Sequence, residues 1–294
     1  MADNDFKTTD LPPMPQVVAK IIQIDENNIN VSSDQIQSLI AVDPALTSKI
    51  LKIANSAFYA RASKVSNLSQ AVTLLGFRTI KSLTLLVSSK DMFPAQKGTM
   101  VVQKELWMRS VLGALIGKLI AEKVELKDSL EEVFMAALLQ NIGQLILHNK
   151  FPRQYSDIFL RAEHGVEIEL LHHLESEAFK INSVEVSALT MQKWNFPKDF
   201  IICAKNHPLN PKTLDKSNTF TQVVSLAYLV VLLTNLTEQA DLSEENKKQV
   251  NDLFESYCKK LGLTKSAQMY FLGDIEQDIR NDSFYSFCSE LFSS

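Results

Sequence analysis

DPALTSKILKIANSAF, residues 43–58, predicts a helix with a defined start. Asp43 can accept hydrogen bonds from the free N–H groups of a first helical turn, and Pro44 suits the first helical position. Leu46, Ile50 and Ile53 follow at helical spacing and would share one apolar face. The segment therefore predicts an amphipathic helix that begins at Pro44.

The same start and stop signals recur along the rest of the chain. A glutamine or glutamate three residues after Ser32, Asn67, Asp128 and Asn182 marks four further candidate caps. Gly76 can close one helix in the left-handed conformation before the next begins. The expected helices cover residues 16–25, 44–57, 67–75, 77–90, 100–124, 128–148, 182–195, 197–207, 219–236, 243–261 and 264–279, and others start near Ser32 and Pro152.

The chain shows no alternating strand pattern, so the predicted fold class is all-α, with roughly a dozen helices in two lobes. Residues 93–98 form the clearest linker because Pro94 and Gly98 lie in a polar gap. We therefore expect one lobe over residues 1–95 and a second over residues 96–294.

Composition excludes several classes of protein. The 294 residues are 46% hydrophobic, which is enough for a sizeable core. Only 8 Gly and 9 Pro occur, and this scarcity of turn residues argues against a β-sandwich, barrel or propeller. The net charge of −4 provides no chain-wide basic field for coating nucleic acid.

Cysteine usage and hydropathy predict a cytoplasmic protein. Cys203, Cys258 and Cys288 are far apart and form no CxxC motif, which fits a reducing compartment without a disulfide framework. The first ten residues are polar, unlike a secretory signal. The most apolar stretch, residues 223–233, is too short to span a bilayer, so no membrane contact is expected.

A set of motifs in a fixed order connects these helices with a known family. The motifs are LPPMP (11–15), DPAL (43–46), IANSAF (53–58), residues 65–71, LLG (74–76), Leu106-Trp107, LLQNIG (138–143) and WNFP (194–197). In this order they resemble the HDOD family, the HD-related output domains of bacterial signalling proteins, over roughly residues 11–207. The resemblance implies an N-terminal helical bundle, residues 1–95, and a lobe similar to HD phosphohydrolases, residues 96–294, which includes a C-terminal helical extension.

HD phosphohydrolases bind metal through a first His, a His-Asp pair, a further His and a late Asp. By resemblance these positions fall at Arg109, at Gln140 and Asn141, at Ser183 and at Tyr228. Arginine is a permanent cation and amides are weak ligands, so we expect no metal and no cofactor. Two interpretations of Gln140 and Asn141 stay open: hydrogen bonding inside the core, or lining a remodelled pocket with Arg109 for an anionic or nucleotide-like ligand.

The other family-motif residues are expected to be structural. Asp43 would cap a helix, and Asn55 would bind backbone groups at a helix end, with a partner-binding role as the alternative for both. His148 would end a helix as a cation, and His164, His172 and His173 would lie on a solvated face. The motif residues expected to be structural are Asp43, Pro44, Asn55, Gly76, Trp107, Gly143, Trp194 and Pro197.

These features predict a non-catalytic module of bacterial signal transduction that acts by binding a protein, or a small ligand. The resemblance implies partners from two-component or cyclic-dinucleotide pathways. One alternative is a metal-dependent phosphohydrolase with displaced ligands. Another is a nucleic-acid-binding regulator, for which the basic-aromatic patch of Phe58, Tyr59, Arg61 and Lys64 is a weak indication.

Overall fold

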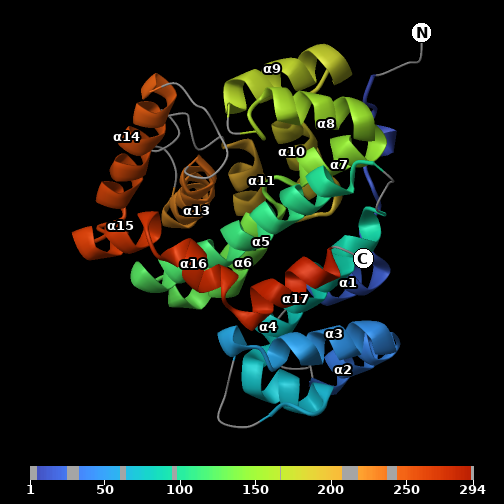
Figure 1. The fold of residues 1–294 in the computed structure, drawn as a ribbon. Helices are drawn as coiled ribbons and strands as arrows, with labels where there is room; N and C mark the ends of the chain where they lie inside the picture. Colours follow the sequence, from blue (N-terminus) through green and yellow to red (C-terminus); the bar gives the residue numbers. More distant parts are fainter. Residues whose placement is uncertain are drawn as a thin grey trace. The chain divides into compact units, whose positions relative to one another are not determined.

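Helices form the regular structure of the residues that the structure describes, which are 5–24, 33–59, 64–94, 98–165, 167–206, 218–236 and 244–292 (Figure 1). In this computed structural model the chain divides into two compact units. The larger unit contains Met1–Pro12 and Ala95–Ile279, and the smaller unit contains Pro13–Pro94 and Arg280–Ser294. The all-helical fold predicted from the sequence is confirmed.

The smaller unit is built around a long helix, α4. Its helices are α1 (Gln16–Ile22), α2 (Ser33–Ala41), α3 (Pro44–Ala54), α4 (Leu68–Ser89) and α17 (Ser283–Leu291), with 3-10 turns at Ala57–Tyr59 and Lys90–Met92. Helix α4 contacts α1, α2 and α3. Ile21, Ile40, Ile50 and Leu83 come from these four helices and are completely buried, so the core of the smaller unit lies between them.

Two of the predicted helix starts in the smaller unit are confirmed. The N–H groups of Ala45 and Leu46 donate to Oδ1 of Asp43 at 2.9 and 3.0 Å, and Pro44 is the first residue of α3. Asn67 caps α4 by accepting a hydrogen bond from the N–H of Gln70 at 2.8 Å. The expected cap at Ser32 lies outside the described residues.

Gly76 interrupts α4 where the sequence predicted a helix end. Its φ of +81° and ψ of 163° are not helical, so the segments before and after it are two helical stretches joined by a kink. Glycine is favoured here because a side chain strains the backbone at positive φ. The glycine of the LLG motif therefore sets a change of direction within the smaller unit.

The larger unit is arranged around α5, which has α6, α7 and α13 as neighbours. Trp107, in the N-terminal half of α5, is buried. The helices are α5 (Met100–Lys123), α6 (Leu130–Leu139), α7 (Ile142–Lys150), α8 (Pro152–Arg161), α9 (Ile168–Phe179), α10 (Ser183–Lys193), α11 (Lys198–Lys205), α13 (Thr219–Leu236), α14 (Glu244–Lys260), α15 (Lys265–Leu272) and α16 (Ile275–Arg280), with 3-10 turns at Thr8–Asp10 and Lys127–Ser129.

The helix expected over residues 128–148 differs from the prediction in two ways. Asp128 does not cap it, because α6 begins at Leu130 after a 3-10 turn. The carboxylate of Glu131 instead pairs with the ammonium of Lys118 in α5, and both side chains are nearly buried. The helix is also broken after Leu139, so that Gln140 and Asn141 form the junction between α6 and α7.

The N-terminal segment belongs to the larger unit, although the predicted ranges placed it in the lobe over 1–95. Nζ of Lys193 donates to the carbonyl of Leu11 at 2.8 Å, and Nε1 of Trp194 donates to the carbonyl of Pro12 at 3.1 Å. These hydrogen bonds give Trp194 and the start of the LPPMP motif a structural role, because they attach Leu11 and Pro12 to the end of α10.

The C-terminal segment belongs to the smaller unit, although the predicted ranges placed it in the lobe over 96–294. Phe284 of α17 stacks on Phe58 with ring centroids 5.7 Å apart, and Lys52 of α3 pairs with Glu290 at 3.1 Å. The sequence did not predict α17, which begins where Asp282 accepts a hydrogen bond from the N–H of Phe284.

Two helical stretches of the described residues, Leu68–Met92 and Lys127–Lys150, are long and apolar enough to span a bilayer. More than half of each stretch is buried inside the protein, and Gly76 interrupts the first. Burial of this extent is typical of the core helices of a folded domain, for which the same length and composition are common.

Candidate functional site

Arg109 lies in a cluster of polar groups where the family resemblance places the first metal-binding histidine. Helix α5 carries Glu105 and Arg109 one turn apart, and Nη2 of Arg109 lies 2.7 Å from Oε1 of Glu105. Nη1 of Arg109 donates to the backbone carbonyl of His164, whose Nδ1 lies 3.1 Å from Oε2 of Glu105. The guanidinium also lies over the ring of Phe159, 5.2 Å from its centroid. We call Glu105, Arg109, Phe159 and His164 the Arg109 cluster.

The Arg109 cluster is an internal ion pair. The side chains of Arg109 and Glu105 are only 14% and 22% exposed. Burial lowers the pKa of Arg109, and the charge of Glu105 opposes that shift. Because a guanidinium keeps its charge even after a moderate shift, the cluster holds one fixed positive charge balanced by one carboxylate.

A second buried group, formed by Tyr155 of α8, Glu175 of α9 and Ser183 of α10, centres on Glu175. The hydroxyl of Tyr155 donates to Oε1 of Glu175 at 3.0 Å, and the N–H of Ser183 donates to Oε2 at 2.7 Å. Burial raises the pKa of Glu175 to about 7, although both hydrogen bonds act in the opposite direction. Glu175 is therefore a buried carboxyl that exchanges its proton near neutral pH.

Tyr228 of α13 connects the two buried groups. Burial raises the pKa of Tyr228 to about 12, the charge of Arg109 opposes this shift, and Glu175 adds to it. Tyr228 also packs with Ile168 and Leu232 in a buried apolar cluster. Five helices, α5, α8, α9, α10 and α13, therefore contribute side chains to one buried region. It contains three of the five predicted site residues: Arg109, Ser183 and Tyr228.

The other two predicted site residues, Gln140 and Asn141, make no hydrogen bond with Arg109 among the described residues. Gln140 is buried, and Asn141 precedes the first residue of α7 without capping it through its side chain. Their segment reaches α10 through Gly143, whose N–H donates to Oγ of Ser187 at 2.8 Å. None of these contacts joins Gln140 or Asn141 to Arg109.

Gly143 explains why the LLQNIG motif ends in glycine. A Cβ atom at this position would lie 2.0 Å from the carbonyl oxygen of Ser183 and 2.8 Å from Ser187. No real side chain approaches a backbone atom so closely, so α7 and α10 can pack at this distance only with glycine at 143.

The residues at the expected HD site do not fit a metal. Arg109 supplies a positive charge, Gln140 and Asn141 supply amides, and Ser183 and Tyr228 supply hydroxyls. Among the described residues there is also no group of three or more His, Cys, Asp or Glu that could hold a metal ion. The carboxylate that does lie beside Arg109, Glu105, is already paired with it.

Sequence reasoning missed Glu105, Tyr155 and Glu175. Glu175 could have been found, because it lies four residues after Leu171 and four before Phe179, in the apolar stripe of its helix. A carboxylate in an apolar stripe is rarely left unpaired, so it signals a buried polar contact. Nothing in the local sequence pairs Tyr155 with it.

The histidines differ from the expectation in three places. His148 is buried, and burial lowers its pKa to about 4, so it is neutral and not a cation at a helix end. His164 contacts Glu105 and is not part of a solvated face. His173 is exposed as expected, whereas burial lowers the pKa of His172 to about 4. Arg61, one of the four residues of the basic-aromatic patch, lies outside the described residues.

Asn55 makes hydrogen bonds to backbone groups at a helix end, as the sequence predicted. Its Nδ2 donates to the carbonyls of Leu51 and Val65, both at 2.8 Å, and its Oδ1 accepts from the N–H of Val65 at 2.9 Å. All three bonds involve backbone groups. Asn55 therefore ends α3 and holds the segment before α4 against it. Pro197 is at the other kind of helix end, because it precedes the first residue of α11.

Comparison with known proteins gives low identities and a shared fold. A protein of Treponema pallidum (strain Nichols) called "Uncharacterized protein" is 22% identical over 221 residues, which are 74% of this chain and 42% of that protein. The chain therefore spans less than half the length of that relative. A crystal structure called "Putative phosphohydrolase", from Shewanella amazonensis SB2B, is 18% identical with a TM-score of 0.70, over 97% of this chain and 96% of that one.

Two further crystal structures have the same fold. An HDOD domain protein of Geobacter sulfurreducens is 21% identical with a TM-score of 0.70, over 96% of this chain and 93% of that one. A "Putative signal transduction protein" of Marinobacter aquaeolei VT8 is 18% identical with a TM-score of 0.71, over 97% of this chain and 60% of that one. The HDOD domain model matches residues 11–208, more than half of the sequence, and the chain belongs to the HDOD domain family.

Proposed function

We propose that this HDOD chain is a non-catalytic signalling module whose output is contact with a protein partner. The observation that carries the proposal is the pairing of Arg109 with Glu105, at the position where the family resemblance expects a metal ligand. A fixed positive charge repels a divalent cation, and the nearby carboxylate is already engaged. A phosphohydrolase of the HD type would need that metal to activate water.

The proposed partners are bacterial signalling proteins of two-component or cyclic-dinucleotide pathways. The Marinobacter structure, whose printed name is "Putative signal transduction protein", supports a role in signalling.

The cysteines support a cytoplasmic location. All three are free and buried, and burial raises the pKa of Cys203 and of Cys258 to about 12, which suits inert thiols in a reducing compartment.

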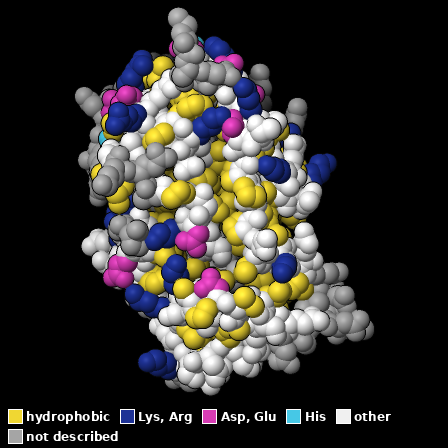
Figure 2. All heavy atoms as spheres, turned by 90° about the vertical axis from the view of Figure 1, so that its right-hand side faces the viewer, with side chains coloured by type: hydrophobic (Ala, Val, Ile, Leu, Met, Phe, Trp, Pro, Cys, Tyr) yellow, Lys and Arg dark blue, Asp and Glu magenta, His cyan; other side chains and the backbone are white. Residues whose placement is uncertain are grey.

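A protein partner is favoured over nucleic acid by the distribution of charge. On the face in Figure 2, Lys and Arg side chains are spread apart, with Asp and Glu among them, and apolar side chains lie between them. Nucleic-acid binding relies on many cations gathered on one surface, whereas the chain as a whole carries a net charge of −4.

The test of the non-catalytic role uses the purified full chain with a phosphomonoester, a phosphodiester and a cyclic dinucleotide, with and without Mn²⁺. We expect no metal-stimulated turnover and less than about one metal per chain by elemental analysis, because strong ligands are absent. Arg109→Gln tests the site, and Arg153→Gln, at an exposed position of α8, is the matched control. Turnover that is lost in Arg109→Gln and kept in Arg153→Gln would overturn the proposal in favour of an enzyme.

Contact with a protein partner is tested by a binding experiment. A partner that co-purifies from native cells should be purified separately and titrated with the full chain. We expect saturable binding at a fixed stoichiometry, with affinity that survives a moderate increase in salt. Binding that weakens steeply with salt and is shared by nucleic acid would favour the nucleic-acid alternative.

A further inference from the structure

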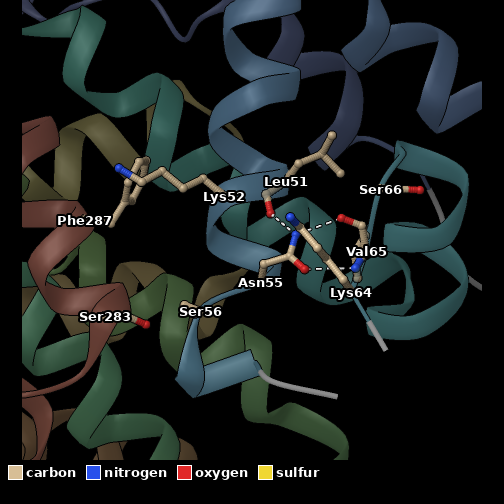
Figure 3. Close-up of a pocket in the computed structure, with 9 residues that line it drawn as sticks. All are labelled: Leu51, Lys52, Asn55, Ser56, Lys64, Val65, Ser66, Ser283 and Phe287. Carbon is tan, nitrogen blue, oxygen red and sulfur yellow. Dashed lines mark hydrogen bonds between the residues drawn. The ribbon is translucent and has the colours of Figure 1, made fainter. Parts of the chain in front are cut away.

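A pocket of about 630 Å³ lies in the smaller unit, and none of its lining residues belongs to the Arg109 cluster. Figure 3 shows that three segments far apart in sequence build it: the C-terminal turn of α3, residues 64–66 before α4, and α17. Its volume is within the range of small-molecule sites. The lining residues are Leu51, Lys52, Asn55, Ser56, Lys64, Val65, Ser66, Ser283 and Phe287.

One wall of the pocket is held rigidly. The three hydrogen bonds from Asn55 to Leu51 and Val65, drawn in Figure 3, attach residues 64–66 to α3. The N–H and hydroxyl of Ser66 both donate to Oε1 of Gln70, at 2.8 and 2.9 Å. A wall that is already ordered loses little conformational entropy when a ligand binds.

The charge of the lining is positive. Lys52 and Lys64 are the charged residues in it, and there is no carboxylate among the lining residues. Lys64 is exposed and makes no ion pair with any described residue. Glu290 of α17 pairs with Lys52, and Asp282, which caps α17, accepts from the N–H of Phe284.

Lys52 can exchange its partner for a ligand. Its side chain and that of Glu290 are 60% and 72% exposed, and an ion pair this exposed contributes little stability. The ammonium of Lys52 also lies 4.8 Å from the ring centroid of Phe287, so the aromatic part of the lining is next to a cation. Ser56 adds a buried hydroxyl that has no hydrogen-bond partner among the described residues.

We propose that this pocket binds a small phosphomonoester, with Lys52 and Lys64 contacting the phosphate and Phe287, Leu51 and Val65 contacting the organic part. A phosphomonoester carries nearly two negative charges at pH 7, which matches two ammonium groups without a lining carboxylate. Lysine binds phosphate well as a point charge. This site goes beyond the proposed protein-binding role, and it shares no residue with the Arg109 cluster.

The test measures binding of phenyl phosphate to the full chain by calorimetry at constant ionic strength. Inorganic phosphate and phenol are the comparison probes, because one lacks the ring and the other lacks the charge. Lys64→Gln removes a charge from the pocket at an exposed position, and Lys20→Gln removes the same charge from an exposed position of α1 in the same unit. Phe287→Leu removes the ring, with folding checked by circular dichroism.

We expect saturable binding of phenyl phosphate, weaker binding of inorganic phosphate and none of phenol. Lys64→Gln should weaken phenyl phosphate about tenfold, as loss of a charged hydrogen bond does, and Lys20→Gln should leave the affinity unchanged. Equal affinities in Lys64→Gln and Lys20→Gln would overturn the proposal. So would the failure of both phosphates to saturate the protein at millimolar concentration. If inorganic phosphate binds as well as phenyl phosphate, the assignment of an ester is wrong.

Discussion

Nη2 of Arg109 and Oε1 of Glu105 form an ion pair, 2.7 Å apart, across one turn of α5. The pair is mostly buried, and the second nitrogen of the guanidinium fork donates to the backbone carbonyl of His164. One side chain thus connects α5 with the turn between α8 and α9. We therefore expect removal of the Arg109 side chain to lower the free energy of unfolding.

Arg109→Met should destabilise the protein by about 2 kcal/mol, because it leaves the Glu105 carboxylate and the His164 carbonyl without their partner. The value is at the lower end for a buried pair since both side chains keep some exposure. Denaturant unfolding measures it. Glu105→Gln together with Arg109→Met should cost less than the sum of the single changes, and additive costs would show that the two residues do not interact.

The pKa of Glu175 predicts a pH dependence of stability. Burial raises this pKa to about 7 in the folded chain, above its ordinary value of 4.5. Between these values the folded state keeps a proton that the unfolded state has lost, so the contribution of Glu175 to the free energy of unfolding falls as pH rises from 4.5 to 7. The full effect is on the order of 3 kcal/mol.

Glu175→Gln isolates that effect, because glutamine does not titrate. Its carbonyl oxygen can accept from the N–H of Ser183, and its amide nitrogen can donate to the hydroxyl oxygen of Tyr155. The difference in unfolding free energy between the variant and the wild type should shift in favour of the variant as pH rises from about 4.5 to 7, and then stay constant. Parallel curves for the two proteins across this range would contradict a raised pKa.

Gly143→Ala should be severely destabilising, by about 3 kcal/mol or more, because the added Cβ meets the Ser183 carbonyl oxygen at 2.0 Å. Gly113→Ala is the matched control in a helix of the same unit. Its nearest atom would be Cγ2 of Val231 at an ordinary 3.7 Å, so higher helix propensity should make it neutral or stabilising. Thermal melts that rank the two variants the other way would refute the close approach of α7 and α10.

Asp43→Ala should cost about 1 kcal/mol, because it removes the side chain that accepts from Ala45 and Leu46 at the start of α3. Asp43→Asn keeps an acceptor at this position and should stay within a few tenths of the wild type. An unchanged denaturation midpoint for Asp43→Ala, together with weaker partner binding, would transfer Asp43 from a structural to a functional role.

The sequence alone determined the helical fold and most of the helix starts and breaks. Caps at Asp43, Asn67 and Asn182 and the break at Gly76 depend on residues within one turn, so their signals are local. The ordered motifs likewise predicted the HDOD family, which the match over residues 11–208 shows. The local signal was wrong at Asp128, because α6 begins at Leu130 after a 3-10 turn and Glu131 pairs with Lys118 of α5.

Only the tertiary structure decided which groups share the buried region and which unit takes each chain end. Arg109 meets the carbonyl of His164 from 55 residues away, and Trp194 reaches Pro12 from 182 residues away. The raised pKa of Glu175 likewise exists because α8, α9 and α10 enclose it. Contacts of this range depend on how helices pack, and packing leaves no periodic signal in a single sequence.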